Sequence, residues 1–162
     1  MLDTAQENRT GQYLTFILDG ELFGVDVRET REILDLPALT RVPQSPEYML
    51  GVINLRGAIV PVVDLRRKFA TAGTAPPANS CVIVLEVATA DGQMVVGALA
   101  DEVCEVLDLD DDQLRPAPRL GTAMRIDYIK GIGRHQERFM ILLDTSRIFA
   151  GGELQQLQAS AA

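Results

Sequence analysis

The sequence predicts an all-β protein made of two small five-stranded barrels with a few short helices. Short runs rich in β-branched and aromatic residues recur along the chain, and turn signals such as Asp19-Gly20 and Asp91-Gly92 separate them. The order of runs and turns also repeats once. Many short strands at close spacing, in a repeated order, are typical of small closed barrels.

The clearest element is a hairpin followed by a helical turn, over residues 51–69. Residues 54–57 form a reversal between two apolar runs, because glycine at the turn supplies the positive φ that a tight reversal needs. Pro61 lacks an N–H, so we expect it at an edge or a bulge. Asp64 is expected to cap the helical turn. A purely structural hairpin leaves the charge of Arg56 at its tip unexplained.

Before this hairpin, the pattern predicts a first hairpin, a helical turn leading into a strand, an extended connection and a short helix. These elements cover residues 13–25, 27–34, 36–43 and 45–50, in that order. Ser45 would cap the short helix, with proline at the first helical position, and Gly51 would end it.

After the hairpin, residues 71–80 have the composition of a linker. The strands expected beyond it, and a last capped helical turn, cover residues 81–87, 94–100, 103–109, 128–133, 138–143 and 144–149. The predicted division is a loose tail over residues 1–10, one barrel at about 11–70, a second at about 81–150, and a tail or weak helix over 151–162.

The two halves of the chain look duplicated. At an offset of 80 positions, Tyr48 matches Tyr128, Gly51 matches Gly131, Val52 matches Ile132, Asp64 matches Asp144 and Arg67 matches Arg147. At an offset of 73, Gly24 matches Gly97 and residues 32–35 match residues 105–108. Because glycine, aspartate and tyrosine are among the matches, duplication is favoured over a chance likeness of two β-rich halves.

Composition limits the class of protein. Apolar residues make up 47% of the 162 residues, which is enough for a large core, and no run is long enough to cross a membrane. The polar N-terminus lacks a secretory signal, so we expect a cytoplasmic protein. The net charge of −8 argues against binding along nucleic acid. Cys81 and Cys104 lie in apolar runs and are predicted to be small buried thiols.

No pattern indicates catalysis, a cofactor or a metal. His135 falls on a predicted hairpin tip without a nucleophile or an orienting carboxylate nearby in the sequence. Residues 108–112 begin like a calcium loop, but Gln113 and Arg119 replace the glycine and glutamate that such a loop requires. Two related barrels without catalytic residues favour binding, and the junction between them is the expected place for a partner.

Motifs over residues 11–150 resemble the CheW-like family of bacterial chemotaxis coupling proteins. The longest is residues 51–57 followed by residues 61–66, and no receiver or kinase domain is attached, as in stand-alone members of the family. The supporting stretches are residues 23–27, 32–33, 41–43, 95–97, 101–103, 115–118 and 128–133.

This resemblance implies two SH3-like five-stranded barrels around a shared core and no enzymatic activity. It also implies a scaffold or adaptor that links the cytoplasmic tip of a chemoreceptor to the regulatory domain of the histidine kinase CheA. The protein would be a monomer when free and would be recruited to membrane-associated receptor arrays without inserting into the membrane. The resemblance implies no cofactor.

By position, the resemblance implies a receptor-binding groove between the two halves. Its residues would be Val27, Thr30, Glu32, Ile33, Arg56, Val103 and Val106. The apolar side chains would hold the receptor helix, while Glu32 and Arg56 would fix its register through charge-assisted contacts. Thr30 is less apolar than the residue expected there.

The resemblance also implies kinase-binding residues on both barrels. Leu36, Leu39 and Val42 are the candidates in the first half, where they lie in an extended connection, and Leu120 is the candidate for a second contact. All four could instead pack at barrel ends.

Several alternatives stay open at this point. Arg56 could stabilise its own barrel, and Val103 and Val106 could belong to the core. Competing functions are a small-ligand-binding barrel, an enzyme that uses His135 or the acidic loop, and a CheW-like adaptor of a non-flagellar chemosensory pathway.

Overall fold

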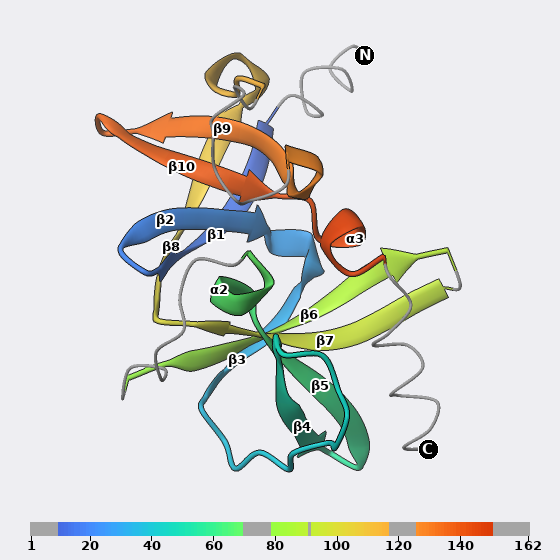
Figure 1. Ribbon diagram of the computed structural model, residues 1–162. Helices are drawn as coiled ribbons and strands as arrows, with labels where there is room; N and C mark the ends of the chain where they lie inside the picture. Colours follow the sequence, from blue (N-terminus) through green and yellow to red (C-terminus); the bar gives the residue numbers. More distant parts are fainter. Residues whose placement is uncertain (1–9, 70–78, 91, 117–125, 151–162) are drawn as a thin grey trace.

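The computed structural model describes residues 10–69, 79–90, 92–116 and 126–150, which form two five-stranded sheets (Figure 1). The strands are β1 Thr10–Leu18, β2 Glu21–Asp26, β3 Thr30–Asp35, β4 Met49–Leu55, β5 Ala58–Asp64, β6 Cys81–Thr89, β7 Gly92–Ala100, β8 Glu102–Asp110, β9 Ile129–His135 and β10 Arg138–Leu143. The fold class predicted from the sequence is confirmed, because strands dominate and the helices are single turns.

The short helices lie where the chain leaves one strand for the next element. They are η1 Val27–Glu29, α2 Leu65–Lys68, η2 Asp111–Gln113, η3 Ile126–Tyr128 and α3 Thr145–Ile148. Asp64 caps α2 by accepting a hydrogen bond from the Arg66 N–H, and Asp144 caps α3 by accepting one from the Arg147 N–H. The predicted caps at both aspartates are therefore confirmed.

Each sheet combines strands from both halves of the sequence. One sheet has the order β8-β1-β2-β10-β9 and the other has the order β3-β6-β7-β5-β4. In each sheet, the two-stranded hairpin of one half has one strand of the other half on one side and two on the other side. The sequence repeat converts one strand order into the other. The structure supports the duplication, but predicted barrel boundaries at about 11–70 and 81–150 do not match this exchange. The chain changes sheet through η1 after β2, and it changes back between β7 and β8.

Isolated bridges join the two edges of each sheet. Thr40, after β3, pairs with Val52 on β4, and Arg115, after β8, pairs with Ile132 on β9. These bridges connect the first and last strands in each sheet order, so each sheet closes into a small barrel.

Two glycines allow the exchanged strands to approach closely. Gly24 on β2 pairs with Leu142 on β10, and its repeat equivalent Gly97 on β7 pairs with Val62 on β5. A Cβ atom on Gly24 would lie 2.9 Å from the Leu142 side chain, and one on Gly97 would lie 2.7 Å from the Val82 side chain. A Cβ atom on Gly24 would thus crowd its parallel neighbour β10, and one on Gly97 would crowd its antiparallel neighbour β6 most.

A large apolar cluster lies between the barrels and takes residues from both sheets. An aromatic series runs through it, with ring centroids 6.1 Å apart for Phe16 and Phe23, 6.0 Å for Phe23 and Phe69, and 5.8 Å for Phe69 and Tyr128. Two smaller clusters fill the barrels themselves. Because they share this cluster, the two barrels pack against each other as one unit.

A lysine joins two repeat-equivalent tyrosines at this junction. The Lys68 Nζ lies 4.1 Å from the Tyr48 ring centroid and 5.8 Å from the Tyr128 ring centroid. The carbonyls of the two tyrosines accept hydrogen bonds from the N–H groups of Asp64 and Asp144, respectively. The repeat is therefore visible in side-chain contacts as well as in strand order.

The short helix predicted after Ser45 is wrong. The chain forms turns there, and the Ser45 hydroxyl donates to the Val42 carbonyl instead of capping a helix. Gly51 lies inside β4, where a Cβ atom would come within 2.6 Å of the Thr40 carbonyl oxygen. Gly51 thus allows the segment around Thr40 to approach β4 closely, and it does not end a helix.

Three smaller expectations also differ from the structure. Pro61 lies in β5, an interior strand, but pairing with β7 begins only at Val62, so that neighbour does not require the missing N–H. His135 is the last residue of β9, one position before the turn. Cys104 is exposed and Cys81 is half-buried, so neither is the fully buried thiol that the sequence predicts.

The tails, the linker 70–78 and residues 117–125 lie outside the described residues, and so do the predictions made for them. Within the described ranges, no helix is long and apolar enough to span a bilayer.

Candidate functional site

The receptor-binding candidates lie mainly on β3 and β8, which are edge strands of different barrels. Ile33 on β3 is 45% exposed, and Val106 on β8 is 46% exposed. The two residues are 73 positions apart and are equivalent in the repeat. Each barrel therefore presents an exposed aliphatic side chain at the same place on an edge strand.

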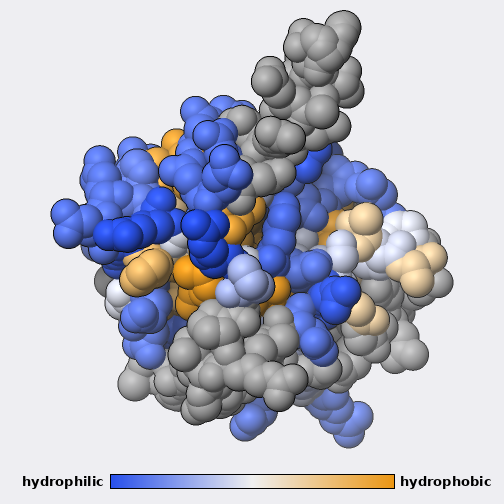
Figure 2. Space-filling view, turned by 90° about the horizontal axis from the view of Figure 1, so that it is seen from above, coloured by the Kyte–Doolittle hydropathy of each residue, from blue (hydrophilic) through white to orange (hydrophobic). Residues whose placement is uncertain are grey.

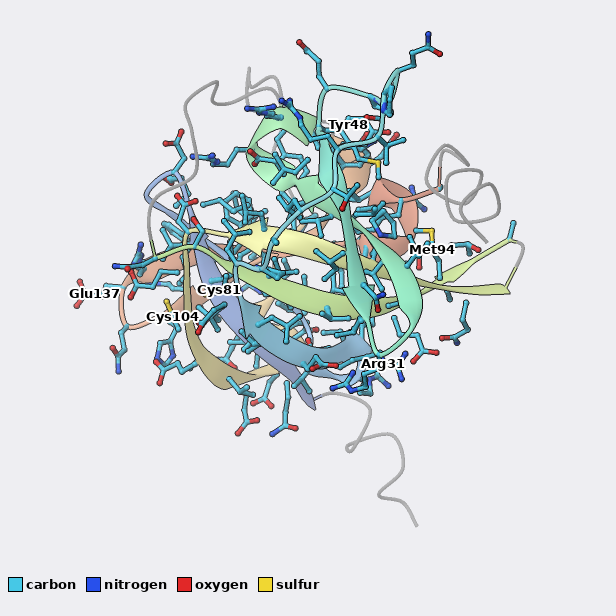
Figure 3. All side chains as sticks on the ribbon, turned by 90° about the horizontal axis from the view of Figure 1, so that it is seen from below. Arg31, Tyr48, Cys81, Met94, Cys104 and Glu137 are labelled. Carbon is cyan, nitrogen blue, oxygen red and sulfur yellow. The ribbon has the colours of Figure 1, made fainter. Side chains whose placement is uncertain are left out.

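The candidates on β3 divide between its two faces. Thr30 and Glu32 are half-buried on one face, while Ile33 points to the more exposed opposite face. Figure 3 shows their neighbour Arg31 on the opposite side of the view from Tyr48, so the outer face of β3 is remote from the α2 side of the barrel junction. Val27, on η1, is half-buried next to this strand.

On β8, an irregularity separates the two candidates. The β1 to β8 register shifts between Leu14 and Phe16, opposite the residues that lie between Val103 and Val106. Val103 is half-buried against the shared core, whereas Val106 is exposed. A core role is thus present for Val103 and absent for Val106.

Arg56 makes its contacts within its own barrel. Its guanidinium donates two hydrogen bonds to the Glu32 carboxylate, at 2.7 and 2.9 Å. The hairpin tip permits this reach because Arg56 has a φ of 51° and Gly57 a φ of 89°, as a tight reversal requires. The ion pair holds the pKa of Glu32 below its usual value and raises that of Arg56.

The second barrel lacks the equivalent ion pair. The repeat counterpart of Arg56 is Gln136, which has the same φ of 51°, and the counterpart of Glu32 is Glu105. In the described ranges, no hydrogen bond joins the Gln136 and Glu105 side chains. The hydroxyl of Thr15 instead donates to the Glu105 carbonyl at 2.6 Å and accepts from the Glu105 N–H at 3.1 Å, which satisfies the bulge in the β1 to β8 ladder.

The kinase-binding candidates differ in exposure. Leu36 is 38% exposed just after β3, whereas Leu39 and Val42 are half-buried. Leu39 packs against the core of its barrel, and Val42 packs against the shared core. Of these three, Leu36 is the side chain that a partner can reach most directly. Leu120 lies outside the described residues.

A feature that we did not predict from the sequence is an exposed aromatic residue at the second hairpin tip. Phe139 on β10 is 66% exposed, and its repeat equivalent Ile59 on β5 is 37% exposed. The Arg134 guanidinium lies 5.9 Å from the Phe139 ring centroid. The offset of 80 that relates the hairpins could have identified both positions, because it pairs two large apolar residues beside polar turns.

Phe139 borders a hollow with a volume of about 840 Å³. It is lined by apolar and charged side chains, including Leu22, Pro116, Ile141 and Arg134. Figure 2 views the molecule from the β9 and β10 side and shows apolar atoms gathered in the middle of the face, with hydrophilic side chains around them. Such a mixture is typical of a protein-binding surface.

A buried charged cluster lies where the chain crosses between the barrels. Arg66 on α2 is 3% exposed, and its guanidinium contacts the fully buried Asp64 at 3.3 Å and Asp101 at 3.9 Å. Asp101 links β7 to β8, and its other carboxylate oxygen accepts the Asp19 N–H at 2.9 Å. This cluster ties α2 of one barrel to a turn of the other.

The described ranges expose large apolar side chains on both barrels. They contain no group of three or more His, Cys, Asp or Glu residues placed to hold a metal ion. The exposed features are aliphatic and aromatic side chains beside a few charges, on two barrels with a common core. Fold and site together define a twin-barrel β protein that offers several separate surfaces to partners.

Comparison with known proteins gives the family. Residues 12–153 match the family described as "CheW-like domain". The chemotaxis protein CheW of Klebsiella aerogenes is 39% identical over 143 residues, covering 88% of this chain and 84% of that protein. The chemotaxis protein CheW of Treponema pallidum is 28% identical over 150 residues, covering 90% of this chain and 86% of that protein.

A solved structure agrees with these relatives. The crystal structure of the scaffolding protein TtCheW from Thermoanaerobacter tengcongensis has a TM-score of 0.79 and 27% identity, covering 90% of this chain and 92% of that chain. The chain belongs to the CheW-like family of bacterial chemotaxis scaffold proteins. The resemblance seen in the sequence and the two-barrel fold implied by it are confirmed.

Proposed function

We propose that this protein is a non-enzymatic adaptor that holds the cytoplasmic tip of chemoreceptors and the regulatory domain of the histidine kinase CheA together. The observation that carries the proposal is the equivalent exposure of Ile33 and Val106 on the edge strands of two barrels that share one core. One rigid unit with separate surfaces suits a bridge between two other proteins. Family membership supports the same role.

The receptor surface would be formed by β3, β8 and the first hairpin tip. An amphipathic helix presents apolar residues along one stripe, and such a stripe needs an apolar surface with a few charges beside it. Ile33 and Val106 supply exposed aliphatic surface, and Glu32, on the other face of β3, supplies charge together with Arg56. Because each of these two charges already has a partner, we propose that the pair acts mainly by holding β3 against the hairpin tip.

The kinase surface on the first barrel would be centred on Leu36. This residue is exposed beyond the end of β3, at the start of the segment that closes the barrel. Leu39 and Val42 would support the segment from beneath, since both pack against core clusters. The exposed position makes Leu36 the residue whose loss should weaken kinase binding without unfolding the barrel.

A second kinase contact would use the other barrel. The hollow beside Phe139 includes Pro116, which lies four residues before the sequence candidate Leu120. An exposed aromatic residue with an arginine beside it is a frequent anchor in protein interfaces. Two kinase surfaces on opposite barrels would let the adaptor and the kinase alternate in an array at the membrane. Residence in the cytoplasm and recruitment to receptor arrays are part of this proposal.

A small-ligand-binding barrel is the weaker alternative. The hollow beside Phe139 is the feature that could suggest it, but its lining includes exposed side chains such as Phe139 and Glu137 at a hairpin tip. The matches to chemotaxis scaffold proteins favour a protein partner for this face.

The test uses two immobilised fragments, the receptor tip and the kinase regulatory domain, each incubated separately with the full chain. We expect both to retain it. Ile33→Asp should lose the receptor fragment and keep the kinase fragment, and Leu36→Asp should do the reverse. Circular dichroism and urea unfolding of each variant check that folding survives. Retention by neither fragment, with the chain folded, would overturn the proposal.

A further inference from the structure

The hydroxyl of Thr30 is buried without a hydrogen-bond partner among the described residues. Thr30 begins β3, and its backbone N–H is already used in a bond to the Val27 carbonyl. The residue as a whole is half-buried, so its remaining exposure belongs to atoms other than the hydroxyl oxygen. Burying an unpaired hydroxyl destabilises a protein, whereas a valine of the same shape avoids that cost.

The repeat provides an internal comparison. The equivalent position in the other half, 73 residues later, is Val103, which packs against the shared core. At the β1 to β8 irregularity, the Thr15 hydroxyl makes two hydrogen bonds to the backbone of Glu105. Thr15 therefore has hydrogen-bond partners for its hydroxyl, and the position equivalent to Thr30 holds a valine, which has no hydroxyl. Thr30 follows neither pattern.

We propose that Thr30, on the face of β3 that it shares with Glu32, is a specificity-determining residue of the receptor-binding surface. Its hydroxyl would bond a neutral polar side chain, such as serine, threonine, asparagine or glutamine, within the apolar stripe of the bound helix. This inference rests on the function proposed above and adds the chemistry of one contact to it. A partner helix with a polar side chain facing Thr30 is preferred over one with an aliphatic side chain there.

A simple rotation would make the hydroxyl available. The oxygen and the methyl group of threonine share one Cβ, and a change of about 120° in χ1 exchanges their places between staggered wells. Thr30 lies at the start of an edge strand, where the ladder with β6 has a register shift between Thr30 and Glu32. Under this proposal the hydroxyl is buried in the free protein, and rotation about χ1 brings it to the partner surface in the complex.

The experiment compares Thr30→Val with the natural protein. We expect the urea midpoint of the free protein to rise, because an unpaired hydroxyl is removed without a change of shape. We expect the affinity for the receptor-tip fragment, measured by calorimetry, to fall about five- to tenfold, as the loss of one hydrogen bond predicts. Thr30→Ser, which keeps the hydroxyl, should retain most of the affinity.

Two further variants make the result specific. Val103→Thr places a hydroxyl at the equivalent position of the other half and should lower the urea midpoint. Added to Thr30→Val, it should not restore the affinity for the receptor-tip fragment. Apolar substitutions of polar residues along the receptor helix, combined with Thr30→Val, should reveal one position at which the two changes are not additive.

The outcomes separate this inference from the proposed function. If the natural protein binds the fragment and Thr30→Val binds equally well, the inference is wrong while the adaptor function stands. A lower urea midpoint for Thr30→Val would also overturn it, because the hydroxyl would then be satisfied in the free protein. If the folded natural protein does not bind the fragment, the adaptor function itself fails.

Discussion

Glu32 and Arg56 join the two edges of the first barrel through a two-pronged ion pair. Glu32 lies on β3 and Arg56 at the tip between β4 and β5, and β3 and β4 are the outermost strands of their sheet. The pair therefore acts across the opening of the barrel, beside the exposed Ile33. Arg56 thus bonds its own barrel, which is one of the two roles considered for it.

Arg56→Gln should weaken receptor binding while the chain stays folded. The substitution removes the ion pair that holds the hairpin tip against β3, so the receptor surface loses its fixed shape. The Arg56 side chain is 71% exposed and Glu32 is half-buried, and we therefore expect only a small fall in the urea midpoint. Calorimetry with the receptor-tip fragment measures the affinity. Unchanged affinity would show that the pair does not shape this surface.

The same pair predicts a pH dependence. Hydrogen bonding from Arg56 lowers the pKa of Glu32 in the folded protein below its ordinary value of 4.5. A lowered pKa stabilises the folded state above the ordinary value, and this contribution is lost as the pH falls through the lowered pKa. The difference in stability between the natural protein and Arg56→Gln should therefore shrink at acid pH. Urea unfolding at pH 7 and below pH 4 measures it, and a constant difference would contradict this.

Glu29 should behave in the opposite way. Burial raises its pKa above the ordinary value of 4.5, although the Thr145 hydroxyl donates to it at 2.7 Å and acts against the shift. The folded state therefore holds this proton more tightly than the unfolded chain does. The associated stabilisation is present at low pH and is lost as the pH rises through the raised pKa.

Glu29→Gln removes this titration and keeps an oxygen that can accept from Thr145. We expect the variant to be slightly more stable than the natural protein at pH 7, by less than about 1 kcal/mol, since the side chain is only half-buried. The advantage should disappear near pH 4.5, close to the ordinary value. Equal pH profiles from urea unfolding would show that the burial of Glu29 has no effect on stability.

Arg66→Met should destabilise the protein strongly. It leaves the fully buried Asp64 without its buried partner and removes the contact to Asp101 at the crossing between barrels. Breaking one side of a buried pair costs about 3 kcal/mol. Arg67→Met is the matched control, because Arg67 also contacts Asp64 but its side chain is 34% exposed. Similar urea midpoints for the two variants would contradict a structural role for the buried cluster.

The sequence predicted local features well and long-range ones poorly. Strands, turns and the caps at Asp64 and Asp144 depend on neighbouring residues, and the structure confirms them. The strand exchange was not predicted, because a repeat shows which segments are alike and not which half completes each sheet. The helix predicted after Ser45 is absent because the Ser45 hydroxyl bonds back to the Val42 carbonyl and the chain continues in turns to β4.

The candidate site shows the same division. Repeat matching placed Ile33 and Val106 at equivalent positions, and the structure finds both exposed. The ion pair between residues 24 positions apart needed the folded arrangement, since it does not follow from spacing along the chain. The offset of 80 can identify the position of Phe139, but its exposure is known only from the folded structure.

The central claim is that one folded chain carries two partners at once. The most direct test is a three-component experiment in which the receptor-tip fragment is immobilised, the kinase regulatory domain is supplied in solution, and the adaptor is added or omitted. We predict that the kinase domain is retained only when the adaptor is present, and that Ile33→Asp or Leu36→Asp abolishes its retention. Equal retention of the kinase domain with and without the folded adaptor would contradict the account.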